Sequence, residues 1–365
     1  MRSKVFSWVL TLFFCVFLGS MVLLYLFSPK ERFSQLEKRY LAESPKLSWD
    51  AIQSGQFSAD AEDYLADHIP FRDLFVGLNA YFKLLTGQQA AEEIQVAPGG
   101  VLLEKSAPWD PRAVQANMDT INAFAAATNA QVDLMIVPSA GWAMADYDDE
   151  ARIRDIYALA GENVTPVDVL TALSAHRDAP LYYRTDHHWT SLGAHTAYAA
   201  YMEAKGRVYR AKEDFAVETV PGFYGSTYSR SALWLTPADT IELWTGTPDL
   251  QVTNKESDEF HTGIFYRERL EEADKYTVFL DGNHSLVTIH NPHAAGKGKL
   301  LVIRDSYSNC LGGFLAESYE TVVLADLRYY KQPVSQLLAQ EGFDHVLVCY
   351  SLGNFLTDKN IIWLR

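Results

Sequence analysis

The sequence predicts an α/β fold: a parallel β-sheet with helices on both faces. Apolar runs of four to six residues alternate with helical patterns from about residue 96 onward. Apolar strands of this length are typical of a parallel sheet that is buried on both sides. Hydrophobic residues make up 48% of the 365 residues, which is enough for a large core. Polar side chains follow the predicted strand ends, where ligands of such sheets bind.

A membrane-spanning helix is predicted at the N-terminus. Residues 5–27 contain no charged side chain, and a helix of about 20 apolar residues crosses a bilayer. Arg2 and Lys4 precede this run, so we expect the N-terminus to stay in the cytoplasm and the rest of the chain to be exported. A cleaved signal peptide is the alternative, although the run is long for one and no Ala-x-Ala site follows it. We therefore interpret residues 1–27 as a cytoplasmic tip and a signal anchor in the cell membrane.

Residues 28–95 are predicted to form a linker and a stalk helix. Residues 28–50 are charged and contain prolines, as is typical of a linker that leaves the membrane. Residues 55–85 have a helical pattern. The sequence Ile69-Pro70-Phe71-Arg72 breaks or kinks this pattern because proline lacks an N–H donor.

The remaining domain is predicted to span residues 96–365. We expect strands at residues 131–137, 179–184, 300–303, 321–325 and 345–350, and helices at residues 111–128, 149–160, 166–176, 191–205, 308–318 and 334–340. Residues 207–295 interrupt the alternation and are rich in Tyr, Trp, Gly and Thr. We expect a β-rich insertion there, whose aromatic side chains either stack on sugars or fill a small secondary core.

The charge balance argues against a nucleic-acid partner. The net charge is −15, and residues 28–365 hold 29 basic and 46 acidic side chains, whereas phosphate binding requires a positive surface. The three cysteines form no Cys-x-x-Cys pair, so the sequence indicates neither a disulfide scaffold nor a thiolate zinc site. Whether Cys310 and Cys349 pair stays open.

Asp186 and His188 are the first candidates for chemistry. In an extended segment their spacing would place both side chains on one side, with His187 pointing the other way. A carboxylate that holds an imidazole beside a serine activates that serine as a nucleophile. Two other interpretations remain. In the first, Asp186, His187 and His188 bind a metal ion. In the second, Asp186 only satisfies backbone N–H groups at a helix start.

Ser306 is the predicted nucleophile. It follows the apolar strand of residues 300–303 and precedes a helix, so its own N–H and neighbouring N–H groups can point at an oxyanion. Asp305 would cap that helix or support the oxyanion site, which leaves the place beside the imidazole to Asp186. The alternative is that Ser306 only caps the helix.

Four further residues are candidates for oxyanion or substrate binding: Asn283, Arg328, Tyr329 and Asn354. Either asparagine would donate to an oxyanion or act as a turn residue. Arg328 and Tyr329 would hold a glycan or support the oxyanion, unless Arg328 forms a local ion pair with Asp326. The mechanism that these residues suggest uses no metal ion and no diffusible cofactor.

These residues resemble those of the bacterial DHHW proteins, relatives of the alginate O-acetylation proteins AlgX and AlgJ among the SGNH-hydrolase-like acyltransferases. The resemblance rests on five motifs: Glu37-Lys38-Arg39-Tyr40-Leu41, Asp67-His68-Ile69-Pro70-Phe71-Arg72, Asp186-His187-His188-Trp189, Asp281-Gly282-Asn283-His284 and Arg304-Asp305-Ser306-Tyr307. It implies an SGNH-hydrolase-like sheet and a catalytic triad in the permuted order Asp186, His188, Ser306.

The resemblance also implies a function. Such a protein is expected to take an acetyl group from a membrane-bound O-acyltransferase and to transfer it, through an acetyl-serine intermediate, onto an exported polysaccharide. Three alternatives remain open: an esterase that removes acetyl groups with the same residues, a scaffold without chemistry, and a metal phosphoesterase.

Overall fold

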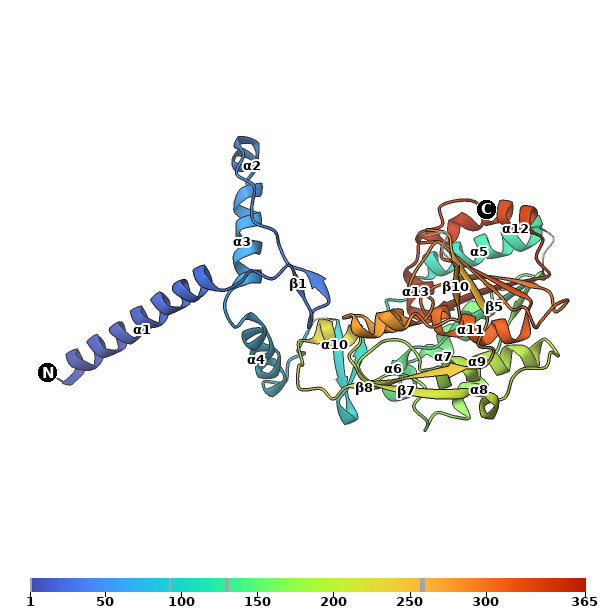
Figure 1. Cartoon of the computed structure of the whole chain (residues 1–365), viewed down its shortest axis with the longest axis horizontal. Coiled ribbons are helices and arrows are strands. Elements are labelled where there is room, and N and C mark those ends of the chain that lie inside the picture. The colour runs from blue at the N-terminus through green and yellow to red at the C-terminus, as the bar shows by residue number, and fades with distance from the viewer. Residues whose placement is uncertain (1, 92, 129–130, 257–259) are drawn as a thin grey trace. The chain divides into compact units, whose positions relative to one another are not determined.

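The computed structural model describes residues 2–91, 93–128, 131–256 and 260–365 (Figure 1). The chain forms two compact units. The smaller unit comprises Met1–Glu92 and Ser229–Leu235, and the larger unit comprises Glu93–Tyr228 and Thr236–Arg365.

A mixed sheet, eight-stranded in the described residues, forms the centre of the larger unit, in the order β10-β9-β11-β13-β12-β14-β5-β6. The last five strands in this order are parallel, whereas β11, β9 and β10 pair antiparallel along one edge. The bounds are β5 (Val132–Val137), β6 (Val164–Pro166), β9 (Gln251–Asn254), β10 (Phe260–Thr262), β11 (Leu286–His290), β12 (Lys299–Arg304), β13 (Thr321–Ala325) and β14 (His345–Ser351).

Two features of this sheet differ from the sequence prediction. The sheet is mixed rather than wholly parallel, because β9, β10 and β11 come from residues 207–295 and extend it. Other strands of this region pair outside the main sheet, namely β7 (Ala216–Phe223) with β8 (Asp239–Thr245). The predicted strand at residues 179–184 is also wrong. The chain folds back on itself there, with the Thr190 N–H donating to the Leu181 carbonyl, and forms only an isolated bridge.

Helices cover both faces of the sheet, as predicted (Figure 1). Along β5, Leu134 and Ile136 belong to the core cluster that includes residues of α5, α7, α12 and α13. Met135 and Val137 belong to the cluster that includes residues of α8, α9 and α11. This alternation buries every residue of β5. The helix bounds are α5 (Pro111–Thr128), α6 (Ala140–Met144), α7 (Asp149–Tyr157), α8 (Leu170–Ser174), α9 (Ser191–Ala204), α10 (Ser226–Ser231), α11 (Ser308–Ser318), α12 (Val334–Glu341) and α13 (Leu352–Thr357). Before them, β3 (Ile94–Ala97) pairs antiparallel with β4 (Val101–Glu104).

The smaller unit is mainly helical. Its elements are α1 (Arg2–Phe27), β1 (Phe33–Ser34), β2 (Arg39–Tyr40), α2 (Trp49–Ser54), α3 (Gln56–His68) and α4 (Arg72–Leu85). The predicted break at Ile69 and Pro70 is confirmed, since it separates α3 from α4. Within the described part of the chain, α1 is the one helix long and apolar enough to cross a membrane. Its composition fits either a membrane anchor or a signal sequence.

An ion-pair cluster connects two of the sequence motifs of the smaller unit. Arg39 Nη2 lies 2.5 Å from Asp67 Oδ1, and Arg72 Nη1 lies 2.7 Å from Glu37 Oε1. The hydrogen bond from Arg39 lowers the pKa of Asp67 to about 2. Asp67 also accepts the Ala42 N–H at 2.9 Å. The cluster therefore ties the segment around β2 to the end of α3.

Candidate active site

Asp186, His188 and Ser306 form a continuous chain of hydrogen bonds. His188 Nδ1 lies 2.5 Å from Asp186 Oδ1, and His188 Nε2 lies 2.8 Å from Ser306 Oγ. All three residues are buried, and the low local dielectric strengthens such bonds. The fold thus brings together three residues that the sequence places in two distant segments.

A tight turn presents Asp186. Its Oδ1 accepts the His188 backbone N–H at 2.9 Å, which is the hydrogen bond of an Asx turn. Its Oδ2 accepts the Ser226 N–H at 2.6 Å. Gly225 allows this approach, because a Cβ at that position would lie 2.1 Å from the Asp186 Cβ. The predicted extended segment is therefore wrong, and a turn places Asp186 beside His188.

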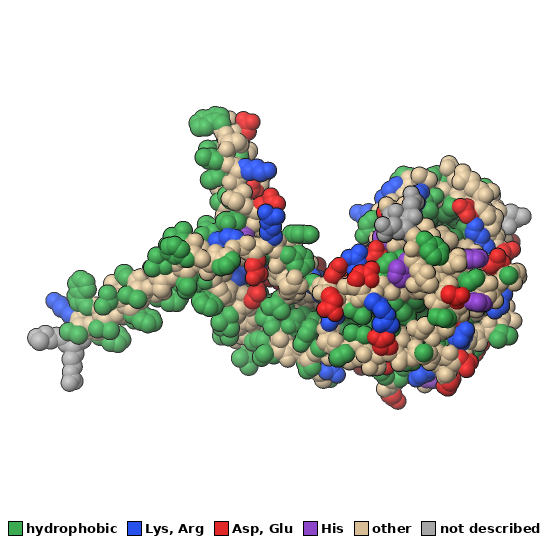
Figure 2. Space-filling view, viewed as in Figure 1, with side chains coloured by type: hydrophobic (Ala, Val, Ile, Leu, Met, Phe, Trp, Pro, Cys, Tyr) green, Lys and Arg blue, Asp and Glu red, His purple; other side chains and the backbone are tan. Residues whose placement is uncertain are grey.

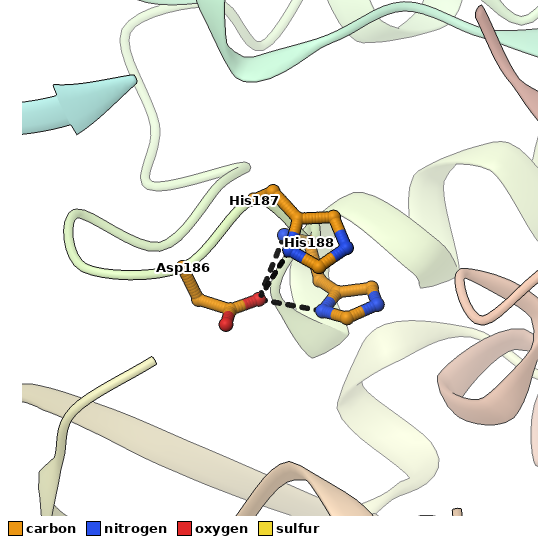
Figure 3. A group of neighbouring side chains, drawn as sticks. All are labelled: Asp186, His187 and His188. Atoms are coloured by element: carbon orange, nitrogen blue, oxygen red, sulfur yellow. Dashed lines mark hydrogen bonds and ion pairs between the residues drawn. The ribbon is translucent and has the colours of Figure 1, made fainter. Parts of the chain in front are cut away.

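His187 lies against His188 rather than pointing away from it. The two ring centroids are 3.8 Å apart, and Figure 3 shows both imidazoles next to the Asp186 carboxylate. His187 Nδ1 lies 2.7 Å from Ser226 Oγ and 3.6 Å from Asp186 Oδ1. The prediction that His187 faces the opposite side fails for the same reason, since side chains do not alternate around a turn.

The same three residues are the candidates for metal binding. One ligand atom from each of Asp186, His187 and His188 can be chosen so that all lie within 4.8 Å of one another. Both ring nitrogens of His188 already take part in hydrogen bonds. A metal ion bound to His188 would therefore displace either Asp186 or Ser306.

The environment keeps Asp186 charged. Burial alone would raise its pKa, but the neighbouring His188 and His187 rings and the hydrogen bonds to its oxygens lower the pKa well below its usual range. Tyr276 stacks on the face of the His188 ring, at 3.9 Å between centroids and 8° between planes. The imidazole is thus fixed by a carboxylate at one nitrogen and by an aromatic face.

Ser306 lies between β12 and α11. Among the described residues, no group accepts a hydrogen bond from the Ser306 N–H. A donor next to the nucleophile that is not already used can stabilise an oxyanion. Trp189, which follows the two histidines, donates its indole N–H to the Tyr307 carbonyl at 3.0 Å. That bond ties the loop of His188 to the turn of Ser306.

Asp305 supports this turn and has no hydrogen bond or ion pair with a histidine in the described structure. It accepts the Tyr307 N–H at 3.0 Å and the Ser351 hydroxyl at 2.7 Å. It also accepts the Asn354 side-chain amide at 2.8 Å. The predicted oxyanion donor Asn354 therefore uses its amide to hold Asp305.

Asn283 lies beside the start of α11. Its Oδ1 accepts one hydrogen bond from Arg304 Nη1 at 3.1 Å and another from Asn309 Nδ2 at 3.0 Å. These two donors fix the oxygen end of the amide, so the NH₂ end is the one that remains to donate.

Arg328 forms the local ion pair that the sequence left open as an alternative. Its Nε and Nη2 lie 2.9 Å and 2.7 Å from the two carboxylate oxygens of Asp326. Tyr329 is 54% exposed. Neither side chain has a hydrogen bond to the Asp186–His188–Ser306 chain in the described residues.

A cavity of about 310 Å³ lies next to the site. Its wall includes His187 and Tyr307, the sequence neighbours of His188 and Ser306, together with Ser351 and Asn354. Ser306 itself is not part of the wall. The cavity therefore adjoins the hydrogen-bonded chain without containing its serine.

Three contributors to the site were missed from the sequence: Gly225, Ser226 and Tyr276. All belong to residues 207–295, where the sequence predicted Asn283 as a site residue and otherwise aromatic contacts to sugars or to a small core. The glycine after Phe223 and Tyr224 was the one available signal, because it marks a close approach of the backbone.

The two remaining cysteines of the larger unit, Cys310 and Cys349, are free and buried. Burial raises the pKa of Cys310 to about 12 and also raises the pKa of Cys349. Neither thiol therefore has the properties of a nucleophile at neutral pH.

The chain resembles several solved structures. A DHHW family protein from Eubacterium siraeum has a TM-score of 0.64 at 24% identity, covering 73% of this chain and 92% of that chain. PatB1 from Bacillus cereus, solved with a sulfonyl adduct, has a TM-score of 0.62 at 17% identity, covering 74% and 98%. The O-acetyltransferase domain of Pseudomonas putida AlgJ has a TM-score of 0.44 at 16% identity, covering 73% and 92%. At these identities, the first two likenesses support the fold.

No curated protein matches the sequence. The family model described as DHHW protein matches residues 117–325, which is more than half of the chain and includes Asp186, His188 and Ser306. The predicted family is confirmed: the chain belongs to the DHHW protein family.

Proposed function

We propose that the protein is an extracytoplasmic O-acetyltransferase that is anchored in the membrane by α1. It would transfer acetyl groups to an exported cell-surface polysaccharide through a Ser306–His188–Asp186 triad. The observation that carries this proposal is the hydrogen-bonded chain from the Asp186 carboxylate through both nitrogens of His188 to the Ser306 hydroxyl. A serine, a base and a carboxylate that orients the base are the parts required for acyl transfer.

In the first half-reaction, Ser306 Oγ attacks the carbonyl carbon of the acetyl donor while His188 Nε2 takes the hydroxyl proton. Asp186 stabilises the resulting imidazolium. The Ser306 N–H, with the Asn283 amide as a candidate second donor, binds the oxyanion. The intermediate then collapses, the bond between the acetyl carbon and the donor breaks, and His188 returns its proton to the leaving group.

In the second half-reaction, His188 takes a proton from a sugar hydroxyl, which attacks the acetyl-Ser306 carbonyl. The bond between the acetyl carbon and Ser306 Oγ breaks, and the serine regains its proton from His188. Transfer to the polysaccharide instead of water defines a transferase. The acetyl donor would be a membrane-bound O-acyltransferase, which α1 would keep nearby.

The test is covalent labelling of the full chain with 4-nitrophenyl acetate or phenylmethylsulfonyl fluoride, followed by intact mass spectrometry. We expect one adduct in the wild type and none in Ser306→Ala. Ser308→Ala is the matched control, because Ser308 is also buried and lies two residues after Ser306, at the start of α11. An adduct that persists in Ser306→Ala would disprove the nucleophile.

An acetyl esterase would use the same groups. The two functions differ in the fate of the acetyl-serine, so the partition between water and an oligosaccharide acceptor separates them. Acetyl transfer that is at least as fast as release of free acetate at millimolar acceptor would support a transferase. Release of acetate alone would favour the esterase.

The grouping of Asp186, His187 and His188 favours one different candidate, a metal phosphoesterase. This candidate predicts stoichiometric metal in the purified protein and loss of phosphoesterase activity with a chelator. The triad predicts that serine labelling is unchanged by the chelator.

A further inference from the structure

Helix α4 carries an exposed apolar stripe. Its members are 45–87% exposed, and we name them the α4 stripe: Phe71, Leu74, Phe75, Leu78, Phe82 and Leu85. Phe71 precedes the helix as its N-cap, and at 100° per residue the other five positions fall within roughly 100° of the helix circumference. Figure 2 shows hydrophobic side chains gathered around this helix and along α1. Six large apolar side chains on one stripe exceed the scattered exposure that is normal for a soluble surface.

The opposite side of α4 is packed and fixes the rotation of the helix. Gly77 and Ala80 are buried, and a Cβ on Gly77 would lie 2.8 Å from the Trp234 ring. The Trp234 indole donates to the Asp73 carbonyl at 3.0 Å. Because the face with Gly77 and Ala80 packs within the smaller unit, the α4 stripe on the other side of the helix is left exposed.

The α4 stripe begins where α1 ends. A cavity of about 390 Å³ in the smaller unit is lined both by Leu24 and Ser28, at the end of α1, and by Phe71 and Leu74, at the start of the stripe. His68 Nε2 also lies 3.1 Å from the Glu31 carbonyl, which holds the end of α3 to the segment after α1. If α1 spans a bilayer, the first turn of α4 therefore lies at the bilayer surface.

We propose that α4 is an interfacial helix whose stripe lies in the lipid of the membrane that α1 crosses. The stripe contains no charge, and Asn79 and Lys83 on the adjacent face would contact the headgroups, as in amphipathic helices at membrane surfaces. Lipid is the occupant that the position favours, because the surface of α1 is unburied and apolar and adjoins the start of the stripe. The smaller unit would then be fixed to the membrane at two places.

The test uses the full chain reconstituted in phosphatidylcholine vesicles. In a Cys15→Ala background, Leu78→Cys places a thiol on the stripe, and Asn79→Cys places one on the adjacent polar face of the same helix. Both positions are exposed, and Cys310 and Cys349 are buried, so an environment-sensitive label reacts at the new thiol. Brominated lipids quench a label in the acyl region, and aqueous iodide quenches a label in water.

We expect brominated lipid to reduce the emission at position 78 at least threefold more than at position 79, and iodide to show the reverse order. No lipid quenching at position 78 would overturn the proposal and would indicate that water, a second copy or another protein covers the stripe. Equal lipid quenching at both positions would also overturn it, because an interfacial helix has two unlike faces. Circular dichroism of both labelled variants checks that the helices are retained.

Discussion

Two buried aspartates lie close to Ser306, and their hydrogen bonds give them different tasks. Asp186 bonds to a titratable ring, His188 Nδ1, at 2.5 Å. Asp305 bonds to groups that do not titrate near neutral pH, among them the Ser351 hydroxyl and the Asn354 amide. Both carboxylates are almost fully buried and multiply bonded. Burial and bond number alone therefore do not distinguish a carboxylate that serves chemistry from one that holds a turn; the partner does.

The largest effect is expected for Asp186→Asn. The asparagine keeps the shape but cannot hold the charge opposite an imidazolium, and its amide favours the wrong His188 tautomer. We expect acetyl transfer from 4-nitrophenyl acetate to fall roughly 10³–10⁴-fold. In free-energy terms this loss exceeds the stability lost because the asparagine can no longer accept both from His188 and from the Ser226 N–H. Because the pKa of Asp186 lies well below its usual range, the wild-type rate should show no loss from protonation of this carboxylate above about pH 4. An Asp186→Asn variant with more than a tenth of wild-type activity would remove Asp186 from the mechanism.

Gly225→Ala tests how closely the carboxylate must be held. The added Cβ would lie 2.1 Å from the Asp186 Cβ, so Asp186 or the backbone of Ser226 must shift. A displacement of about 1 Å in a catalytic group costs about 10²-fold in rate. Gly19→Ala, where the new Cβ meets nothing within 4 Å, controls for the general effect of such a change. Acetyl-enzyme formation measured by rapid-quench mass spectrometry gives the rate, and unchanged rates in Gly225→Ala would show that the turn adapts.

Asp305→Asn should reverse the pattern of Asp186→Asn. A side-chain amide has one accepting oxygen, so it cannot serve both the Tyr307 N–H and the donors from Ser351 and Asn354. Leaving one buried donor unpaired costs about 2–3 kcal/mol of stability. The turn of Ser306 would loosen, but His188 would remain as the base. We therefore expect only about a tenfold loss of activity. Urea unfolding, together with hydrogen exchange in β12 and β14, measures the stability. If the loss of activity, expressed as a free energy, exceeded the loss of stability, Asp305 would do more than hold the turn.

Partners also decide which parts of the fold could be predicted from the sequence. The strands β5, β12, β13 and β14 are continuous apolar runs, and a local pattern is enough to find them. The edge made by β9, β10 and β11 depends on pairing with a distant strand, which no local pattern encodes. Leu181, Tyr182 and Tyr183 resemble a strand in sequence because they are apolar and buried in the core, but they do not extend the sheet.

Within the candidate site, residue types were easier to predict than geometry. The sequence indicated Asp186, His188 and Ser306 as candidates because their chemistry is distinctive. The expected strand alternation was wrong, since a turn places Asp186 beside His188. The neighbours of Asp305 and Asp186 in the sequence were enough to favour Asp186 as the partner of the imidazole. Tyr276 and Gly225 could not be assigned, because their partners lie in other segments of the chain.

Asp67 in the smaller unit is a half-buried carboxylate, and its substitution should have the smallest effect. Its folded pKa is lowered to about 2, chiefly by the hydrogen bond from Arg39, so its stabilisation is present above the unfolded pKa near 4 and is lost as the pH falls toward 2. The side chain is 11% exposed and Arg39 is 41% exposed, so solvent screening limits the contribution to about 1 kcal/mol. We expect Asp67→Asn to speed hydrogen exchange in α3 about fivefold at pH 6, and this difference from the wild type to shrink as the pH approaches 2. Acetyl transfer from 4-nitrophenyl acetate should be unchanged, because Asp67 bonds only to groups that do not titrate in this range, as Asp305 does. If Asp67→Asn lost activity without a change in hydrogen exchange, the hydrogen-bond partners of a carboxylate would not be enough to tell a structural role from a catalytic one.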